Sequence, residues 1–234
     1  MRYSGSLAKE EREKIFGLFL ESPKMRFNQI EKALKIRSNK LAYHLEMMQK
    51  EGLIQKKGFD YNLSEKGEKY IPIFSHITGT ELSPLPVILV AIVNKNKILM
   101  IKRNKRPYKN YWSLIGGKML LGEDFKEASL RLVKEKTNLN GSFASYNAVL
   151  HERVSGYKGV KYAFILFFTK VITKDIKFRE SNHGNLRWIG SLKKEKIIPS
   201  DRWLIINKLN SRIRITNALM RDREGELSEF RISG

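Results

Sequence analysis

The period of the apolar residues changes once along this chain of 234 residues, and that change limits the folds open to it. From residue 7 to about residue 52 the apolar residues recur every three or four positions, which predicts short amphipathic helices. From about residue 85 they form short uninterrupted runs, which are typical of buried strands. Residues 79–86 contain two prolines and follow neither period, which indicates a linker. We therefore predict an α+β protein of two domains, residues 1–78 and 87–210, with a tail at residues 211–234.

The second domain is expected to alternate strands with two helices. Two strands at about 85–93 and 97–102 are joined by an Asn-Lys-Asn turn, which is a hairpin signal. Helices are expected at about 125–137 and 201–210, which together with the strands predicts a layered domain. The tail has a turn signal at residues 222–226 and could form a hairpin. The sequence leaves open whether the tail is a dimer strand, a lid or a disordered end.

The charge balance is strongly basic. Lysine and arginine number 45 against 24 acidic residues, a formal net charge of +21. Residues 1–82 account for only +4 of this surplus, so the remaining +17 lies in the second domain and the tail. Such a balance favours a polyanionic partner such as nucleic acid, a nucleotide or anionic lipid. Simple solubility in a basic proteome is the alternative.

Composition excludes several classes of protein. The absence of cysteine excludes disulfide scaffolds, zinc sites built on thiolates and cysteine nucleophiles. No apolar run is long enough to span a bilayer. The first residues contain no apolar signal region, so we expect a cytoplasmic protein with no membrane partner.

The first domain is expected to contain three short helices followed by a hairpin. The hairpin strands are predicted around residues 53–56 and 61–63. This order, together with the segments Ser38–Leu45, Gly52–Ile54 and Tyr61–Gly67, resembles the winged helix-turn-helix domain of ArsR- and MarR-type regulators. The resemblance implies DNA binding, with the third helix in the major groove and the hairpin on the backbone. It also implies a homodimer, because such regulators usually bind palindromes.

On this interpretation the exposed face of the third helix reads the bases. Leu41, Leu45 and Met48 face inward on that helix. The residues assigned to DNA are Ser38, Asn39, Lys40, Tyr43 and His44 on the helix, and Lys56 and Lys57 on the hairpin. A solvated polar face, or a surface for protein contacts, is the alternative for this set.

The second domain carries a spaced motif. Gly117 is followed after five residues by Glu123 and after seven more by Arg131. This spacing resembles the box of the Nudix family, and the resemblance covers about residues 85–209. It implies a Nudix-type α/β/α sandwich and a structural ion pair between Glu123 and Arg131. Family members bind a divalent metal through three glutamates of the box helix and hydrolyse nucleoside diphosphate derivatives.

The metal-binding positions of the box depart from the family pattern. They are occupied by Leu132, Glu135 and Lys136. These positions share one helical face, where three carboxylates could hold Mg²⁺ or Mn²⁺. One carboxylate beside an ammonium holds such an ion poorly, so we expect no cofactor and no metal-dependent hydrolysis. Glu135 is the remaining catalytic or metal candidate if hydrolysis persists, and only then is Mg²⁺ or Mn²⁺ expected.

A lysine in the box also suggests a different use of the site. Lys136 could supply the positive charge that the metal supplies elsewhere. The predicted ligand-binding residues for a nucleotide-type phosphorylated metabolite are Lys102, Arg103, Gly116, Gly117 and Lys136. Alternatively, Lys136 pairs with Glu135 or faces solvent. Glu152 and Glu180 are weaker candidates for a distant carboxylate, and Trp112 and Trp188 could stack a base or fill the core.

These observations favour a DNA-binding transcription regulator whose Nudix-like domain senses a phosphorylated metabolite. The alternative is an active Nudix hydrolase of nucleoside diphosphate derivatives with an accessory winged helix. In a third hypothesis the whole chain binds nucleic acid, with the +17 half contacting it directly.

Overall fold

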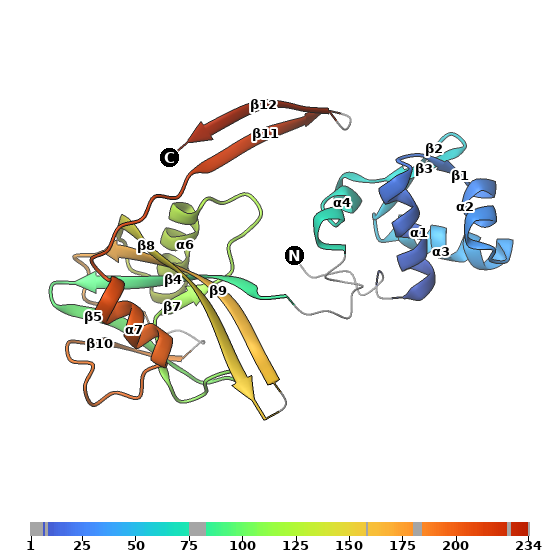
Figure 1. Ribbon diagram of the computed structural model, residues 1–234. Helices are drawn as coiled ribbons and strands as arrows, with labels where there is room; N and C mark the ends of the chain where they lie inside the picture. Colours follow the sequence, from blue (N-terminus) through green and yellow to red (C-terminus); the bar gives the residue numbers. More distant parts are fainter. Residues whose placement is uncertain are drawn as a thin grey trace. The chain divides into compact units, whose positions relative to one another are not determined.

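The computed structural model describes residues 7, 9–74, 83–157, 159–179, 184–223 and 226–233. The chain divides into two compact units, Met1–Ser83 and Pro84–Gly234 (Figure 1). The division falls inside the predicted linker, of which residues 79–82 lie outside the described residues. In the described part of the chain, no helix combines the length and the apolar character needed to cross a membrane.

The first unit consists of short helices and a small sheet. Its helices are α1 (Glu10–Glu21), α2 (Phe27–Leu34), α3 (Ser38–Lys50), α4 (Glu65–Glu68) and the 3-10 turn η1 (Ile71–Ile73), and its strands are β1 (Met25–Arg26), β2 (Ile54–Lys57) and β3 (Asp60–Leu63). The strands are antiparallel in the order β1-β3-β2. The predicted hairpin is therefore confirmed to within one residue. The two-residue strand β1 is too short to show any period in the sequence.

The core of the first unit lies among its three longer helices. The predicted stripe on α3 is confirmed, because Leu41, Leu45 and Met48 are all fully buried. They pack with Ile15 of α1 and Ile30 of α2. Burial of such side chains contributes about 1.5–3 kcal/mol each, which is the main force holding short helices together.

One expectation on α3 is wrong, because His44 is buried rather than exposed. Its side chain is only 7% exposed. It follows Leu41 by three positions, so it lies at the margin of the buried stripe and faces α1, where its Nε2 is 4.0 Å from a Glu11 carboxylate oxygen. Burial lowers the pKa of His44, and the nearby Glu11 only partly opposes this. A neutral, buried imidazole cannot reach a DNA groove.

The second unit is a mixed sheet with two helices and a terminal hairpin. Its strands are β4 (Leu85–Asn94), β5 (Lys97–Arg103), β6 (Trp112–Ser113), β7 (Ile115–Gly117), β8 (Ser142–Gly156), β9 (Gly159–Ile172), β10 (Gly184–Ile189), β11 (Asn217–Arg223) and β12 (Glu226–Ser233), and its helices are α6 (Phe125–Thr137) and α7 (Pro199–Lys208). The predicted helix at 125–137 is confirmed at both ends. Asp124 caps it by accepting a hydrogen bond from the Glu127 N–H, and Asn138 ends it in left-handed geometry.

The sheet follows the order β10-β5-β4-β9-β8, with β6 on β5 and β7 on β4. Among the strand pairs of the described residues the β4–β9 pairing is the parallel one, and it brings Leu85 opposite Phe164 and Leu89 opposite Phe168. β7 pairs with β4 so that Gly116 lies opposite Leu89. At the centre of the sheet, β4 therefore lies between β9 and the short strand β7, which carries Gly116 and Gly117.

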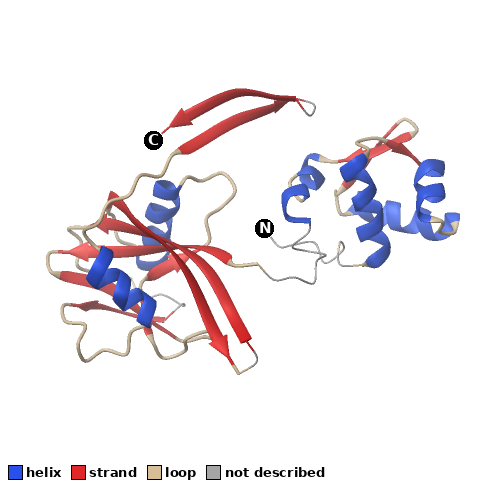
Figure 2. Ribbon diagram, in the orientation of Figure 1, coloured by secondary structure: helices blue, strands red, loops and turns tan. Residues whose placement is uncertain are grey.

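The helices cover opposite faces of this sheet (Figure 2). Alternate residues of a strand point to opposite faces. Leu89 and Ala91 therefore share a core with Leu204 of α7, whereas Ile88 and Val90 share one with Leu132 of α6. This is the predicted α/β/α layering.

The predicted tail hairpin is present as β11 and β12, which pair only with each other in the described residues. A bulge interrupts their register between Leu219 and Arg221. Arg221 pairs with Glu229 at 2.9 Å. Several apolar side chains of this hairpin, including Phe230, are exposed.

Candidate functional site

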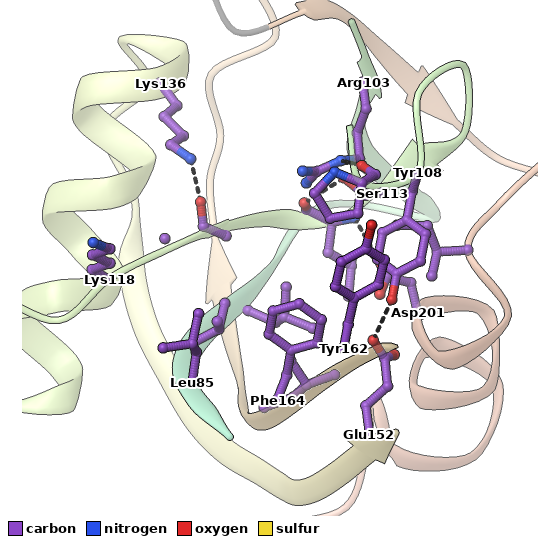
Figure 3. Close-up of a pocket in the computed structure, with 18 residues that line it drawn as sticks. Leu85, Arg103, Tyr108, Ser113, Lys118, Lys136, Glu152, Tyr162, Phe164 and Asp201 are labelled. Carbon is purple, nitrogen blue, oxygen red and sulfur yellow. Dashed lines mark hydrogen bonds between the residues drawn. The ribbon is translucent and has the colours of Figure 1, made fainter. Parts of the chain in front are cut away.

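A cavity of about 470 Å³ lies beside the glycine pair of the second unit (Figure 3). β4 and β9 supply its apolar wall through Leu85, Val87, Leu89, Phe164 and Leu166. These side chains share one face of the sheet because residues two apart on a strand point the same way. The remaining lining comes from the end of β5 and the loop after it, from β6, β7 and β8, from the last turn of α6, and from the start of α7.

Two lysines lie at one end of this cavity, and Arg103 lies between them and Tyr108, whose ring centre is 6.0 Å from the guanidinium carbon. Arg103 comes from the end of β5, Lys118 follows β7, and Lys136 comes from the last turn of α6. A second, more polar cavity of about 250 Å³ shares Arg103 and Lys136 and adds Lys105 and Arg106. We call Arg103, Lys118 and Lys136 the basic end. Its charge and donors suit phosphate oxygens.

Lys136 is held by the backbone and faces the cavity. Its Nζ donates a hydrogen bond to the carbonyl oxygen of Gly116 (Figure 3). Glu135 does not share that position and instead pairs with Arg131 at 2.9 Å. Burial lowers the pKa of the Lys136 ammonium, and the positive charge of Arg103 lowers it further. An anion entering the cavity would relieve both effects.

Gly116 and Gly117 are required by close approach of their neighbours. A Cβ at Gly117 would lie 2.4 Å from Cδ2 of Leu132, and one at Gly116 would lie 2.8 Å from Cδ2 of Leu89. Both glycines line the cavity, as the sequence predicts for a ligand site. Their bare backbone lets the end of β7 lie close to Leu89 of β4 and to Leu132 of α6.

The predicted ion pair between Glu123 and Arg131 is present. The Arg131 guanidinium donates from Nε and Nη2 to the Glu123 carboxylate, and from Nη2 to the Lys118 carbonyl oxygen at 2.9 Å. Glu123 also accepts from the Leu120 N–H at 2.8 Å. The pKa of Glu123 is lowered, chiefly by the Arg131 hydrogen bonds. This network joins α6 to the loop that carries Lys118, so its role is to position the basic end.

The side chains at the three box positions lie in three different environments. Leu132 is only 3% exposed and lies in the core beneath Gly117. Glu135 is exposed, and Lys136 faces the cavity. Among the residues that the structure describes, no group of three histidine or acidic side chains could hold a metal ion. Of the three box positions, Glu135 alone carries a carboxylate.

The opposite end of the cavity is acidic, and we call its residues Tyr108, Glu152 and Asp201 the inner end. The Tyr108 hydroxyl donates to Glu152 Oε1 at 2.8 Å, and Asp201 Oδ2 accepts from the Leu114 N–H at 2.7 Å (Figure 3). Burial raises the pKa of Asp201 to about 7, and Glu152 adds to this effect. Burial and the bond to Glu152 raise the pKa of Tyr108.

Sequence reasoning captures the basic end better than the inner end. Four of the five predicted ligand residues line the cavity, but Lys102 does not, because it precedes Arg103 on β5 and points to the other face. Glu152, a weaker candidate for a distant carboxylate, lines the cavity. Tyr108 and Asp201 are not among the predicted site residues. The one sequence feature that points to Asp201 is its position as an acidic residue at the start of an apolar helix.

Trp112 and Trp188 do not line this cavity. Trp112 is buried in the core that faces α7, with the Arg187 guanidinium 4.4 Å from its ring centre. Trp188 packs on the other face, and its Nε1 donates to the Ile176 carbonyl oxygen. Both tryptophans therefore follow the core-filling alternative. Glu180 lies outside the described residues.

In the first unit, the residues assigned to DNA lie on α3 and β2. Ser38, Asn39, Lys40 and Tyr43 are exposed on α3, and Lys56 and Lys57 are exposed on β2. Two of them have partners, because Ser38 donates to Glu31 and Lys40 pairs with Glu11. His44 alone of the set is buried.

Comparison with known proteins identifies the second unit. Residues 83–193 match the model of the NUDIX domain, so the chain contains a NUDIX domain there. The ADP-ribose pyrophosphatase of Methanocaldococcus jannaschii is 41% identical over 58 residues, which are 25% of this chain and 34% of that protein. The chain thus matches about a third of the length of this curated relative.

Solved structures are also similar to this chain. The NUDIX domain of Shewanella oneidensis NrtR, in complex with ADP ribose, matches with a TM-score of 0.46 and 14% identity, covering 54% of this chain and 86% of that one. The MutT protein of Bacillus halodurans matches with a TM-score of 0.47 and 20% identity, covering 63% of this chain and 96% of that one.

Proposed function

We propose that this NUDIX-domain chain is a DNA-binding transcription regulator whose second unit binds a nucleoside-diphosphate-type metabolite without metal-dependent hydrolysis. The observation that carries the proposal is the cavity, which two lysines and an arginine line beside an apolar wall. ADP-ribose is the first ligand to test, because the partly matching archaeal relative is an ADP-ribose pyrophosphatase. A cytoplasmic homodimer is the expected working form.

The chemistry of the basic end supports binding rather than hydrolysis. In a metal-dependent hydrolase, divalent ions neutralise the pyrophosphate and activate a water. Here Lys136 occupies the cavity wall and Leu132 lies in the core. Lysine and arginine can neutralise phosphate charge and donate hydrogen bonds to it. They do not lower the pKa of a water as a bound metal does, so a bound diphosphate would remain intact.

The architecture of the first unit supports DNA binding. Its three longer helices precede the β2–β3 hairpin, and α3 exposes Asn39 and Tyr43 over its first two turns. Such a helix fits the major groove, where an asparagine can read adenine. Lys56 and Lys57 are exposed on β2, where Lys56 lies over the Tyr61 ring, and both suit backbone phosphates. Ligand binding could alter DNA affinity only if one geometry of the dimer binds the ligand better than another.

The ligand half of the proposal is tested by calorimetric titration of the full chain with ADP-ribose in EDTA. Binding is expected without Mg²⁺. Lys136→Gln should weaken it about tenfold, the cost of one charge-assisted hydrogen bond. Lys126→Gln is the matched control, because Lys126 is an exposed lysine at the other end of α6. Binding that strictly requires Mg²⁺, or release of AMP at a rate typical of working hydrolases, contradicts the proposal.

The DNA half is tested with duplexes selected by the full chain from a randomised pool. Asn39→Ala should relax the sequence preference at one position, by about 1–3 kcal/mol. Lys57→Gln should weaken binding to all duplexes alike. It should also reduce the slope of log affinity against log salt concentration by about one. Lys50→Gln is the control, because Lys50 ends α3 at the opposite end from Ser38 and pairs with Glu46. Failure to enrich any sequence, with no salt-sensitive binding, contradicts this half.

A further inference from the structure

The two ends of the cavity differ in the charge of the side chains that line them. Arg103, Lys118 and Lys136 line one end, and Tyr108, Glu152 and Asp201 line the other. Arg103 lies between the two, because its charge acts on the pKa of both Lys136 and Asp201. A ligand that carries phosphates at one end and a neutral, donor-bearing group at the other is the chemistry that fits both ends at once.

The inner end repels phosphate. Glu152 already accepts the Tyr108 hydroxyl, and a carboxylate offers further acceptor sites but no donor when ionised. A phosphate oxygen placed there would meet the like charge of the partly buried Glu152 carboxylate and be repelled by it. The diphosphate must therefore lie at the basic end, and the rest of the ligand must extend over the apolar wall.

That wall suits a flat ring. Phe164 and Tyr162 lie on β9, with ring centres 6.5 Å apart and planes tilted by 32°. Leu85 of β4 lies opposite Phe164 in the parallel pairing. Both aromatic side chains and Leu85 line the cavity (Figure 3). Apolar and aromatic surfaces of this kind hold nucleobases by stacking and by exclusion of water.

We infer that the inner end reads the nucleobase of the bound nucleotide and selects a base that presents an amino group to Glu152. The inference rests on the proposed nucleotide binding and adds the orientation of the ligand and its base. Glu152 is the acceptor for the amino group. Tyr108 is a positioning residue, because its hydroxyl holds one oxygen of the Glu152 carboxylate at 2.8 Å.

Asp201 completes this end from the first turn of α7. Its side chain is only 3% exposed, and one of its oxygens is already used by the Leu114 N–H. It therefore forms a buried wall beside Glu152. A base carbonyl would meet the Glu152 acceptor, whereas an amino group could donate to it.

The test compares ADP-ribose with IDP-ribose, whose base carries a carbonyl oxygen in place of the amino group. The full chain is titrated with each in EDTA. ADP-ribose should bind at least about tenfold more tightly, because a site built for a donor rejects the analogue that lacks it. Glu152→Gln should reduce this ratio to about threefold or less, since an amide can also donate to a carbonyl. Tyr108→Phe should reduce the ratio by a smaller factor.

Two controls separate this inference from the proposed function. Glu195→Gln also removes a negative charge, but Glu195 pairs with Arg187 away from the cavity, so the ratio should stay unchanged. Inorganic pyrophosphate probes the basic end alone, and its affinity should fall in Lys136→Gln but not in Glu152→Gln. Tight ADP-ribose binding with a ratio near one, or a ratio unaffected by Glu152→Gln, overturns the inference and leaves the proposed function standing. If neither nucleotide binds, both fail.

Discussion

The basic end and the inner end of the cavity differ in how far apart their residues lie along the chain. Gly116, Gly117, Lys118 and Lys136 come from one continuous stretch of loop and helix, to which only Arg103 is added. Tyr108, Glu152 and Asp201 come from a loop, a strand and a helix that meet only in the folded unit. The first end therefore depends on local geometry, whereas the second depends on the register of the whole sheet.

The two ends also hold charge differently. At the basic end the cations remain partly open to solvent, and Glu123 anchors the loop through Arg131. At the inner end a carboxyl group is almost wholly buried. Local, solvated charge has a small effect on stability, whereas a buried and unpaired charge has a large one. Variants at the two ends should thus differ most in their effect on the free energy of unfolding.

The largest effect is expected for Asp201→Asn, and it should depend on pH. Because the pKa of Asp201 rises on folding to about 7, the folded state keeps its proton at pH values where the unfolded state has lost it. The parent therefore loses stability as pH rises from about 4 to about 7. Asparagine does not titrate, so the stability of Asp201→Asn relative to the parent should rise by on the order of 2–4 kcal/mol over that range and then level off.

The measurement is urea unfolding followed by tryptophan fluorescence. Trp112, Trp188 and Trp203 are all in the second unit, so the signal reports that unit alone. Asparagine can still accept the Leu114 N–H through its side-chain oxygen. A difference between variant and parent that is flat from pH 4 to 7 would show that Asp201 is ionised in the folded protein, and would remove the contrast between the ends.

A smaller effect is expected for Gly117→Ala at the basic end. The added methyl group would lie 2.4 Å from Cδ2 of Leu132, so Leu132 must shift in the core. We expect a loss of about 2 kcal/mol in the free energy of unfolding. Gly122→Ala is the matched control, since a Cβ there meets nothing within 4 Å. In a Leu132→Ala background the cost of Gly117→Ala should fall toward zero, and an unchanged cost would mean that the collision is not its cause.

The contrast between the ends also explains what the sequence could predict. The spacing from Gly117 to Arg131 predicts the glycine turn, the box helix and the ion pair, because all lie within about four helical turns of one another. The helix ends follow from Asp124 and Asn138, whose capping roles are local. Periodicity predicts the principal strands, but β6 and β7 have only two and three residues, too few to show a period.

The inner end could not be predicted, because it depends on which strands pair and in what register. Glu152 lies opposite Phe164 across β8 and β9, and no local pattern encodes that pairing. A shift of one residue would turn Glu152 to the other face. The predicted exposure of His44 is wrong for a related reason. Helical periodicity places His44 at the margin of the buried stripe, and the sequence does not show that α1 covers it.

The smallest effect on the free energy of unfolding is expected for Glu135→Gln. The same variant tests whether the basic end still supports a metal ion. Glu135 is more than half exposed and only adds one bond to Arg131, which keeps Glu123 and the Lys118 carbonyl oxygen. The free energy of unfolding should fall by only a few tenths of a kcal/mol. Glu123→Gln, which weakens a more buried carboxylate held by the same arginine, should cost about 1–3 kcal/mol.

The same pair of variants tests the chemistry. ADP-ribose affinity in EDTA should be unchanged in Glu135→Gln, because Glu135 does not line the cavity, whereas Glu123→Gln should weaken it by loosening the loop that carries Lys118. AMP release from ADP-ribose in Mg²⁺, followed by chromatography, should be absent in the parent and in both variants. Release by the parent that disappears in Glu135→Gln would mean that a single box carboxylate, aided by others, still supports a metal. The basic end would then be a catalytic site, and Lys136 would not replace the ion.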